Sequence, residues 1–212
     1  MIHVLAAKVE MQLADDIYRK YLDFLPPSLK ERNLKFVRWE DRQTNLFGKI
    51  LLMEGLQQLG FERSVLDDLR YNSYGRPFLN AHIDFNISHS GYYVLCAISS
   101  GQRVGVDVEM LRPVNLTYFE SVMTAAEWAL IKNSGNDTQL FFKYWTIKES
   151  VVKADGRGLN IPLQHIAVHN NEVCYDGVTW YLSELDLGPG YCGHVVTDRP
   201  ADNITFHLKS YA

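Results

Sequence analysis

The fold is decided by residues 83–110, which read IDFNISHSGYYVLCAISSGQRVGVDVEM. The first five of these residues alternate between apolar and polar, as in a β-strand that buries one face. The apolar run 93–98 predicts a second strand, and alternation returns over residues 104–110. Because the turn-forming residues 99–102 separate the last two segments, we predict that these two segments form a hairpin.

Helical patterns precede this stretch. We predict a first strand over residues 2–9, followed by a helix near Ser28, because Ser28 and Glu31 match the reciprocal capping box. A longer helix is predicted over residues 41–59, where apolar residues recur with helical spacing. Gly60 is placed to end that helix.

The second half of the chain repeats the same mixture of elements. Residues 113–132 and 139–154 predict two helices, and short strand-like segments follow from residue 161. The predicted fold class is therefore α+β, with two similar subdomains over residues 1–102 and 103–212. No sequence repeat accompanies this plan. The absence of a long linker predicts that the subdomains pack as one body.

The composition predicts a folded, soluble protein and argues against several classes. Hydrophobic residues make up 47% of the 212-residue chain and charged residues 22%, close to the globular average. The formal net charge of -4 argues against the basic field of a nucleic-acid-binding protein. No apolar run predicts a membrane span or secretory signal. The odd number of widely spaced cysteines favours a reducing cytoplasm: Cys96, Cys174 and Cys192.

Two carboxylates share one face of the strand VGVDVE, residues 104–109. Asp107 and Glu109 are two residues apart, so both side chains point to the same side of an extended chain. A hard divalent cation such as Mg²⁺ would relieve their repulsion and would also hold a phosphate. The alternative is an amphipathic edge strand with a solvated acidic face.

An aromatic, an acid and a base line up along the predicted helix that contains WTIKESVVK. Trp145, Glu149 and Lys153 are spaced four residues apart and form one stripe. In a functional interpretation, Glu149 is a third carboxylate and Lys153 a cation for phosphate. The alternative is a surface Glu-Lys pair that stabilises its own helix by about 0.2–0.5 kcal/mol.

The segment FNISHSG, residues 85–91, delivers polar side chains to a turn that glycine permits. Ser88 and His89 can both donate hydrogen bonds to phosphate oxygens. A nucleophilic triad is disfavoured, because adjacent side chains diverge on an extended backbone and no GxSxG elbow is present. Just upstream, Arg76 in the sequence GRPF is either part of a simple turn or a phosphate clamp.

Taken in order, the motifs GRP, FNISHS, VGVDVE and WTIKESVVKADGRGL resemble those of the 4′-phosphopantetheinyl transferase superfamily, in its longer surfactin-synthetase-activator type. The resemblance spans roughly residues 28–162. It implies two similar α+β subdomains packed as a pseudo-symmetric monomer, with the active site in the cleft between them. The chain length is similar to that of the two-in-one monomer rather than the short trimeric form.

The resemblance also implies roles for individual residues. The metal ligands would be Asp107, Glu109 and Glu149, with Mg²⁺ as the metal and Mn²⁺ as an alternative. The catalytic residues would be Glu149, Lys153 and His89. The residues that bind coenzyme A would be Arg32, Arg76, Ser88, His89 and Lys153. Residues 43–45 (QTN) depart from the pattern, because relatives often have an arginine and a small hydroxyl residue there.

The reaction that the resemblance implies has coenzyme A and an apo acyl or peptidyl carrier protein as substrates, without nucleic acid or membrane. A carrier serine attacks the β-phosphate and receives the phosphopantetheinyl arm, and adenosine 3′,5′-bisphosphate leaves. Glu149 or a water molecule would accept the serine proton. Residues 114–127 would help to receive the carrier's helix, but the sequence does not identify the carrier or its pathway.

Two other functions would use similar residues. A Mg²⁺-dependent phosphodiesterase or nucleotide hydrolase also needs three carboxylates and phosphate-binding cations. A non-catalytic carrier-binding scaffold is the other alternative. The transferase is favoured over the scaffold because all three carboxylates are intact.

Overall fold

The computed structural model describes residues 1–79, 82–201 and 203–211, and it confirms an α+β fold built on two main sheets. The first sheet has the strand order β11 (Ile204–Lys209), β1 (Ile2–Lys8), β5 (Tyr93–Ser100) and β4 (Ile83–Ser90). The second has the order β6 (Val104–Met110), β10 (Tyr191–Thr197), β9 (Val178–Glu184), β8 (Glu172–Tyr175) and β7 (Ala167–His169). Strands β1 and β11 are parallel, and the other pairs are antiparallel.

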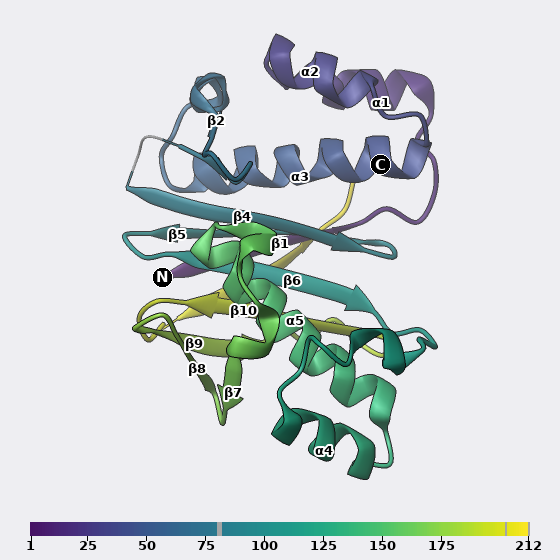
Figure 1. Ribbon diagram of the computed structural model, residues 1–212. Helices are drawn as coiled ribbons and strands as arrows, with labels where there is room; N and C mark the ends of the chain where they lie inside the picture. The colour runs from purple at the N-terminus through teal and green to yellow at the C-terminus, as the bar shows by residue number, and fades with distance from the viewer. Residues whose placement is uncertain (80–81, 202, 212) are drawn as a thin grey trace.

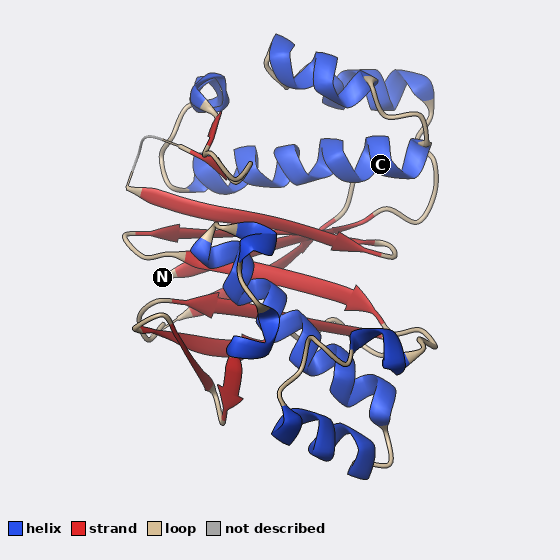
Figure 2. Ribbon diagram, in the orientation of Figure 1, coloured by secondary structure: helices blue, strands red, loops and turns tan. Residues whose placement is uncertain are grey.

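Helices cover the outer sides of the two sheets (Figures 1 and 2). On the first sheet lies α3 (Trp39–Gln58), and α1 (Asp15–Leu22) and α2 (Pro27–Leu34) lie over α3 on the side away from the sheet. On the second sheet lies α5 (Asp137–Asp155), and α4 (Ala125–Asn133) packs against α5. Shorter elements are the 3₁₀ turns Arg63–Asp68, Leu116–Phe119, Gly158–Asn160 and Leu163–His165 and the strands β2 (Arg70–Tyr71) and β3 (Pro77–Phe78).

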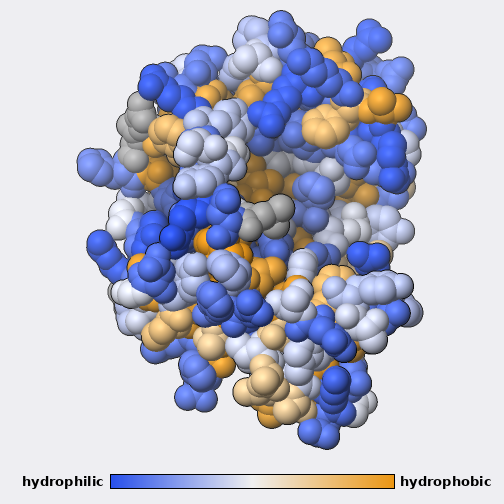
Figure 3. Space-filling view, viewed as in Figure 1, coloured by the Kyte–Doolittle hydropathy of each residue, from blue (hydrophilic) through white to orange (hydrophobic). Residues whose placement is uncertain are grey.

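Separate apolar clusters hold these layers together. The two sheets pack on each other through side chains such as Val4 and Leu95 from the first and Val106 and Val195 from the second. A further cluster joins α3 to the first sheet, and another joins α5 to the second. On the face shown in Figure 3, hydrophilic residues predominate and the hydrophobic residues form separate patches. No helix in the described ranges is long and apolar enough to span a membrane.

The predicted hairpin between residues 93–98 and 104–110 is wrong. β5 is paired on both edges, with β1 and with β4, so it offers no edge to β6. The chain instead turns at Gly101, which has a φ of 83°, and enters the second sheet. The hairpin that forms joins β4 to β5 across Gly91.

One edge of β6 pairs with the backbone of β10, and the other edge pairs with a row of side chains on β4. The amides of Val104, Val106, Val108 and Met110 donate to the side-chain oxygens of Asp84, Asn86, Ser88 and Ser90, over 2.8, 3.0, 3.4 and 3.1 Å. We call these four pairs the side-chain seam. Because unpaired buried amides are costly, the seam joins the two sheets and fixes the register of β4 on β6.

Two helix predictions need correction. The capping box at Ser28 does not form, because α2 begins one residue earlier with Pro27 in its first turn. A capping box occurs instead at Thr124 and Glu127, where α4 starts. For this reason residues 113–132 are not one helix. The helix predicted over residues 139–154 is confirmed as α5.

The last strand returns to the first sheet. β11 pairs with β1, so residues from the end of the chain complete the sheet that the N-terminal half begins. The division of the chain into residues 1–102 and 103–212 stays a prediction.

Gly105 allows β6 to pack directly on α5. A Cβ atom at this position would lie 2.0 Å from the carbonyl oxygen of Ser150 and 2.7 Å from the amide nitrogen of Ala154. Both neighbours are helix backbone and cannot move independently of α5. The glycine therefore sets how closely the polar faces of β6 and α5 approach each other.

We expect Gly105→Ala to lower the free energy of unfolding by about 3 kcal/mol, at the upper end of overpacking effects. Urea denaturation monitored by fluorescence measures the loss. Because the added methyl group pushes α5 away from β6, any activity that needs the polar faces of β6 and α5 close together should fall in the folded fraction as well. A variant with wild-type stability and wild-type activity would contradict this close packing.

Candidate active site

A polar pocket lies where β4, β6 and α5 meet, and we call it the carboxylate pocket. Its lining includes Ser88 and His89 from β4, Asp107 and Glu109 from β6, and Trp145, Glu149 and Lys153 from α5. The structure thus brings together three motifs that lie far apart in the sequence. The side-chain seam and the Gly105 contact position them.

Asp107 is the centre of the hydrogen bonds in this pocket. Its Oδ1 accepts from Ser88 Oγ at 2.8 Å and pairs with Lys153 Nζ at 2.6 Å. Its Oδ2 is buried and has no hydrogen-bond partner in the described part of the chain. Because Asp107 is only 4% exposed, it does not belong to a solvated acidic face.

Glu109 is held on both sides. Its Oε2 accepts from Ser90 Oγ at 2.7 Å, and its Oε1 accepts from Trp145 Nε1 at 3.2 Å. Ser90 also accepts the amide of Met110 through the side-chain seam. The same serine therefore fixes both the strand register and the carboxylate.

Three carboxylates face one lysine ammonium in this pocket. Burial raises the pKa of Glu109, and the charge of Asp107 adds to the shift, while hydrogen bonds from Ser90 and Trp145 oppose it. Burial and the charge of Asp107 also raise the pKa of Glu149, against the opposing effect of Lys153. The site therefore carries uncompensated negative charge that a cation would relieve.

The donor chemistry of the pocket fits a divalent cation. Carboxylate oxygens are the ligands that Mg²⁺ prefers, and the buried Asp107 Oδ2 lacks a protein donor. Among the described residues, however, no three His, Cys, Asp or Glu side chains are already arranged to hold a metal ion. Lys153 pairs with Asp107, and Ser90 and Trp145 hold Glu109, so the carboxylates would have to turn to converge on one ion.

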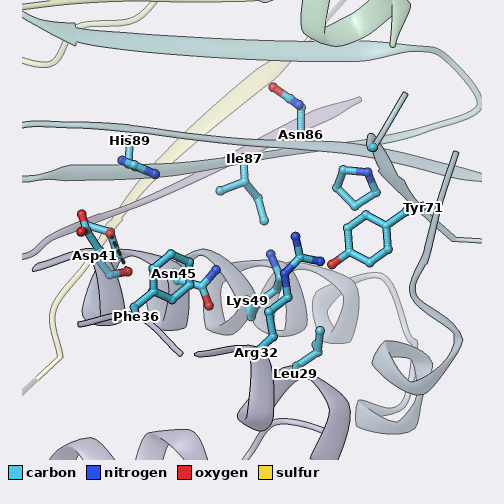
Figure 4. A pocket seen from close by; sticks show the side chains of 13 residues that line it. Leu29, Arg32, Phe36, Asp41, Asn45, Lys49, Tyr71, Asn86, Ile87 and His89 are labelled. Atoms are coloured by element: carbon cyan, nitrogen blue, oxygen red, sulfur yellow. Dashed lines mark hydrogen bonds between the residues drawn. The ribbon is translucent and has the colours of Figure 1, made fainter. Parts of the chain in front are cut away.

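A second pocket adjoins the first, and we call it the helix-side pocket (Figure 4). It has a volume of about 320 Å³ and lies between α2, α3 and β4. His89 and Ile87 line both pockets. Burial and the charge of Lys153 lower the pKa of His89, which favours a neutral imidazole. Arg32, predicted to bind coenzyme A, lies in this pocket with its guanidinium 4.7 Å from the centre of the Tyr71 ring.

Arg76 does not line either pocket. Its Nε donates to the carbonyl of Lys153 at 2.8 Å, and its Nη2 forms an ion pair with Asp84 at 2.8 Å. Asp84 belongs to the side-chain seam. Arg76 therefore ties the end of α5 to β4, and its phosphate-binding role stays a prediction.

Sequence reasoning missed several residues of the site. Ser90 received no role, although it donates to Glu109. Trp145 was predicted to share a helix face with Glu149 and Lys153, but its hydrogen bond to Glu109 was not predicted. Polar residues at every second position of β4 were the available signal, because they indicate that this face meets polar groups. Lys49 of α3 lines the helix-side pocket and was also missed.

Comparisons with known proteins place these motifs in a family. The family model described as "4'-phosphopantetheinyl transferase superfamily" matches residues 103–189, and the one described as "4'-phosphopantetheinyl transferase, N-terminal" matches residues 13–101. The 4′-phosphopantetheinyl transferase gsp of Aneurinibacillus migulanus is 34% identical over 202 residues, which cover 89% of this chain and 83% of the relative. The 4′-phosphopantetheinyl transferase Sfp of Bacillus subtilis (strain 168) is 29% identical over 211 residues, which cover 91% of this chain and 90% of the relative.

One solved structure resembles a smaller part of the chain. The holo-[acyl-carrier-protein] synthase of Thermotoga maritima matches 45% of this chain and 61% of its own, with 17% identity and a TM-score of 0.36.

Proposed function

This chain belongs to the 4′-phosphopantetheinyl transferase superfamily and is an enzyme of that activity, and we propose how its side chains carry out the transfer. The family implies coenzyme A and a carrier protein as substrates. In our proposal a serine hydroxyl of the apo-carrier attacks the β-phosphate of coenzyme A. The phosphopantetheinyl arm moves to the serine, and adenosine 3′,5′-bisphosphate leaves.

The carboxylate pocket holds the pyrophosphate together with Mg²⁺, for which Asp107, Glu109 and Glu149 are the ligands. The buried, unpartnered Asp107 Oδ2 is the observation that carries this assignment. When bound, the metal supplies Lewis-acid polarisation of the phosphate and orients the reacting groups. Mn²⁺ is an alternative metal because it also prefers oxygen donors.

The other side chains of the pocket bind phosphate or handle the proton. Lys153 stabilises negative charge on the leaving bisphosphate, and His89 holds a phosphate oxygen where the two pockets join. Ser88 orients both Asp107 and Lys153 through its hydroxyl, in addition to the proposed phosphate contact. A carboxylate oxygen of Glu149 accepts the serine proton, because this side chain lines the pocket and forms no hydrogen bond among the described residues.

The architecture proposed here is a pseudo-symmetric monomer with its active site in the cleft between residues 1–102 and 103–212. The carboxylate pocket supports it, since β4 comes from the first half and β6 and α5 from the second. The chain length of 212 residues, similar to that of the two-in-one monomer, favours a monomer. We further propose that the enzyme acts in the cytoplasm and that residues 114–127 contact the carrier.

The experiment that tests the function mixes the protein with coenzyme A, Mg²⁺ and a panel of apo-carrier proteins, and weighs the carriers by mass spectrometry. At least one carrier should gain one phosphopantetheinyl group. Release of adenosine 3′,5′-bisphosphate without any carrier would instead favour a hydrolase. Carrier binding without a mass gain would favour a scaffold.

We expect Glu149→Gln to reduce kcat by about 10²–10⁴-fold while the affinity for coenzyme A changes little, because the variant loses a base and a charged ligand. The measurement is kcat over a wide Mg²⁺ titration, and recovery at high Mg²⁺ would indicate that the ligand role dominates. Glu184→Gln is the matched control, because Glu184 is exposed and pairs with Lys143 instead. Wild-type kcat at every Mg²⁺ concentration would refute both roles of Glu149.

A further inference from the structure

We propose that His194 of β10 is a positioning residue of the active site, which holds α5 so that Glu149 faces the carboxylates of Asp107 and Glu109. This inference rests on the proposed function, because it takes these three side chains as the metal ligands. It adds a residue that none of the sequence motifs contains.

His194 lies next to Asp107 in the second sheet. In the antiparallel register of β10 on β6, His194 pairs with Asp107 and Cys192 pairs with Glu109. Paired residues of antiparallel strands project from the same face of a sheet, and α5 packs on this face of both strands (Figure 1). His194 is only 2% exposed, so it is enclosed between the sheet and the helix.

Two side chains of α5 form hydrogen bonds with this one residue, and we call His194, Thr146 and Ser150 the helix anchor. Thr146 Oγ1 lies 2.8 Å from His194 Nδ1, and Ser150 Oγ donates to the carbonyl of His194 over 2.9 Å. Thr146 and Ser150 are one turn apart on α5, and both are fully buried. Because hydrogen bonds are directional, these two contacts fix the rotation of α5 about its axis and its height above the sheet.

Glu149 lies between the two contacts along the helix. It follows Thr146 by three residues and directly precedes Ser150, so any rotation of α5 changes the direction of its side chain. In the described part of the chain, no hydrogen bond holds the Glu149 carboxylate itself. The helix anchor therefore sets the position of this third carboxylate relative to the two carboxylates on β6.

The chemistry of His194 suits a positioning role. A buried polar ring is unfavourable unless it is hydrogen-bonded, so packing alone would be served better by an apolar side chain. Burial lowers the pKa of His194 to about 4, against the opposing charge of Glu184, and the ring is neutral near neutral pH. A neutral ring leaves the negative charge of Asp107 available to a cation, while its Nδ1 binds Thr146.

The test compares His194→Leu with the wild type in the carrier-modification assay and in Mg²⁺ calorimetry. Leucine fills a similar volume but loses the contact with Thr146. Residues that orient metal ligands typically contribute 10–100-fold to metal affinity or activity, so we expect a loss of about that size in both kcat and Mg²⁺ affinity. The KM for coenzyme A should change less than kcat, because no residue of α5 lines the helix-side pocket.

Two further variants test the contact itself, each at a temperature where the protein is folded. His194→Asn should recover most of the loss, because the side-chain amide takes the position of Nδ1 and can bond to Thr146. Thr146→Val removes the other partner with little change in shape and should reproduce the loss. The double variant His194→Leu, Thr146→Val should be no slower than the slower single variant, because all three lose the same contact.

Thr197→Val is the matched control. Thr197 is a buried residue of the same strand, but its Oγ1 donates to the carbonyl of Arg199 and not to α5. This variant should keep the wild-type kcat and Mg²⁺ affinity.

Three outcomes would overturn the proposal. The first is a His194→Leu protein that is less stable but, while folded, has the kcat and Mg²⁺ affinity of the wild type, since His194 would then be merely structural. The second is a His194→Asn variant as slow as His194→Leu. The third is a double variant in which the losses of the two single variants multiply.

The outcomes separate this inference from the function on which it rests. A wild type that modifies a carrier, with His194→Leu equally fast, contradicts only the role of the helix anchor. A wild type that neither binds coenzyme A nor modifies any carrier contradicts the proposed function itself.

Discussion

Asp107→Asn is expected to reduce kcat about 10³-fold. Asp107 is the proposed metal ligand whose Oδ2 has no protein partner, and its Oδ1 holds Lys153 and Ser88 in place. Loss of Lewis-acid stabilisation raises the activation free energy by several kcal/mol. Each 1.36 kcal/mol slows the reaction about tenfold. The asparagine keeps the size and one acceptor oxygen, so the strand and the side-chain seam should survive.

Three measurements check this result together: kcat, Mg²⁺ affinity by calorimetry, and urea denaturation. We expect weaker Mg²⁺ binding and a slower reaction in a protein that still unfolds cooperatively. Asp16→Asn, an exposed carboxylate in the first turn of α1, should leave all three unchanged. Wild-type kcat together with unchanged Mg²⁺ affinity in Asp107→Asn would refute the metal assignment.

The strands could be predicted from the sequence better than their partners. Alternation over residues 83–87 predicts β4, but it does not show that the polar face of β4 meets β6. That outcome depends on long-range contacts, in which Asp84, Asn86, Ser88 and Ser90 satisfy backbone amides of another sheet. A local pattern contains no information about such a distant partner.

Helix α1 was not predicted, and its sequence shows why. The segment DDIYRKYL has one apolar face, formed by Ile17, Tyr18, Tyr21 and Leu22, and its charged residues are exposed. Tyr18 and Tyr21 pack against the core cluster under α3, and Tyr18 donates to Asn33. The helical pattern is therefore present, but it extends over only eight residues, a length at which a helix depends on such tertiary contacts.

The site could be predicted wherever residues act through local spacing. Asp107 and Glu109 share a strand face, and Glu149 and Lys153 share a helix face, as the periods of these elements require. The contact of Arg76 could not be predicted in this way. The motif GRP is a local signal, but the Arg76 guanidinium donates to the carbonyl of Lys153, which lies 77 residues further along the chain.

Lys148 precedes Glu149 on α5 but points in another direction, because successive residues on a helix are about 100° apart. Its side chain is 0% exposed, and its Nζ pairs with Glu127 at 2.9 Å. The same ammonium donates to the carbonyls of Leu163 and Ile166. Lys148 thus joins α5 to the start of α4 and to the turn before β7, away from the carboxylate pocket.

The partner of Lys148 is equally enclosed. Glu127 accepts from the amide of Thr124 at 2.7 Å in the capping box and from the amide of Val168 at 3.2 Å. Removal of the lysine would leave this buried carboxylate without its counter-charge. Burial lowers the pKa of Lys148 and Glu127 opposes that shift, as expected when each charge depends on the other.

We expect Lys148→Met to lower the free energy of unfolding by about 3–5 kcal/mol, the usual cost of an uncompensated buried charge. Urea denaturation measures this loss. Lys143→Met, on the same helix, is the control, because its pair with Glu184 is exposed and should contribute less than about 1 kcal/mol. The double variant Lys148→Met, Glu127→Gln should recover part of the stability, because it removes the unpaired charge.

At a temperature where Lys148→Met remains folded, its kcat should stay near the wild-type value. A stable variant with a kcat as low as that of Asp107→Asn would instead place Lys148 in the active site.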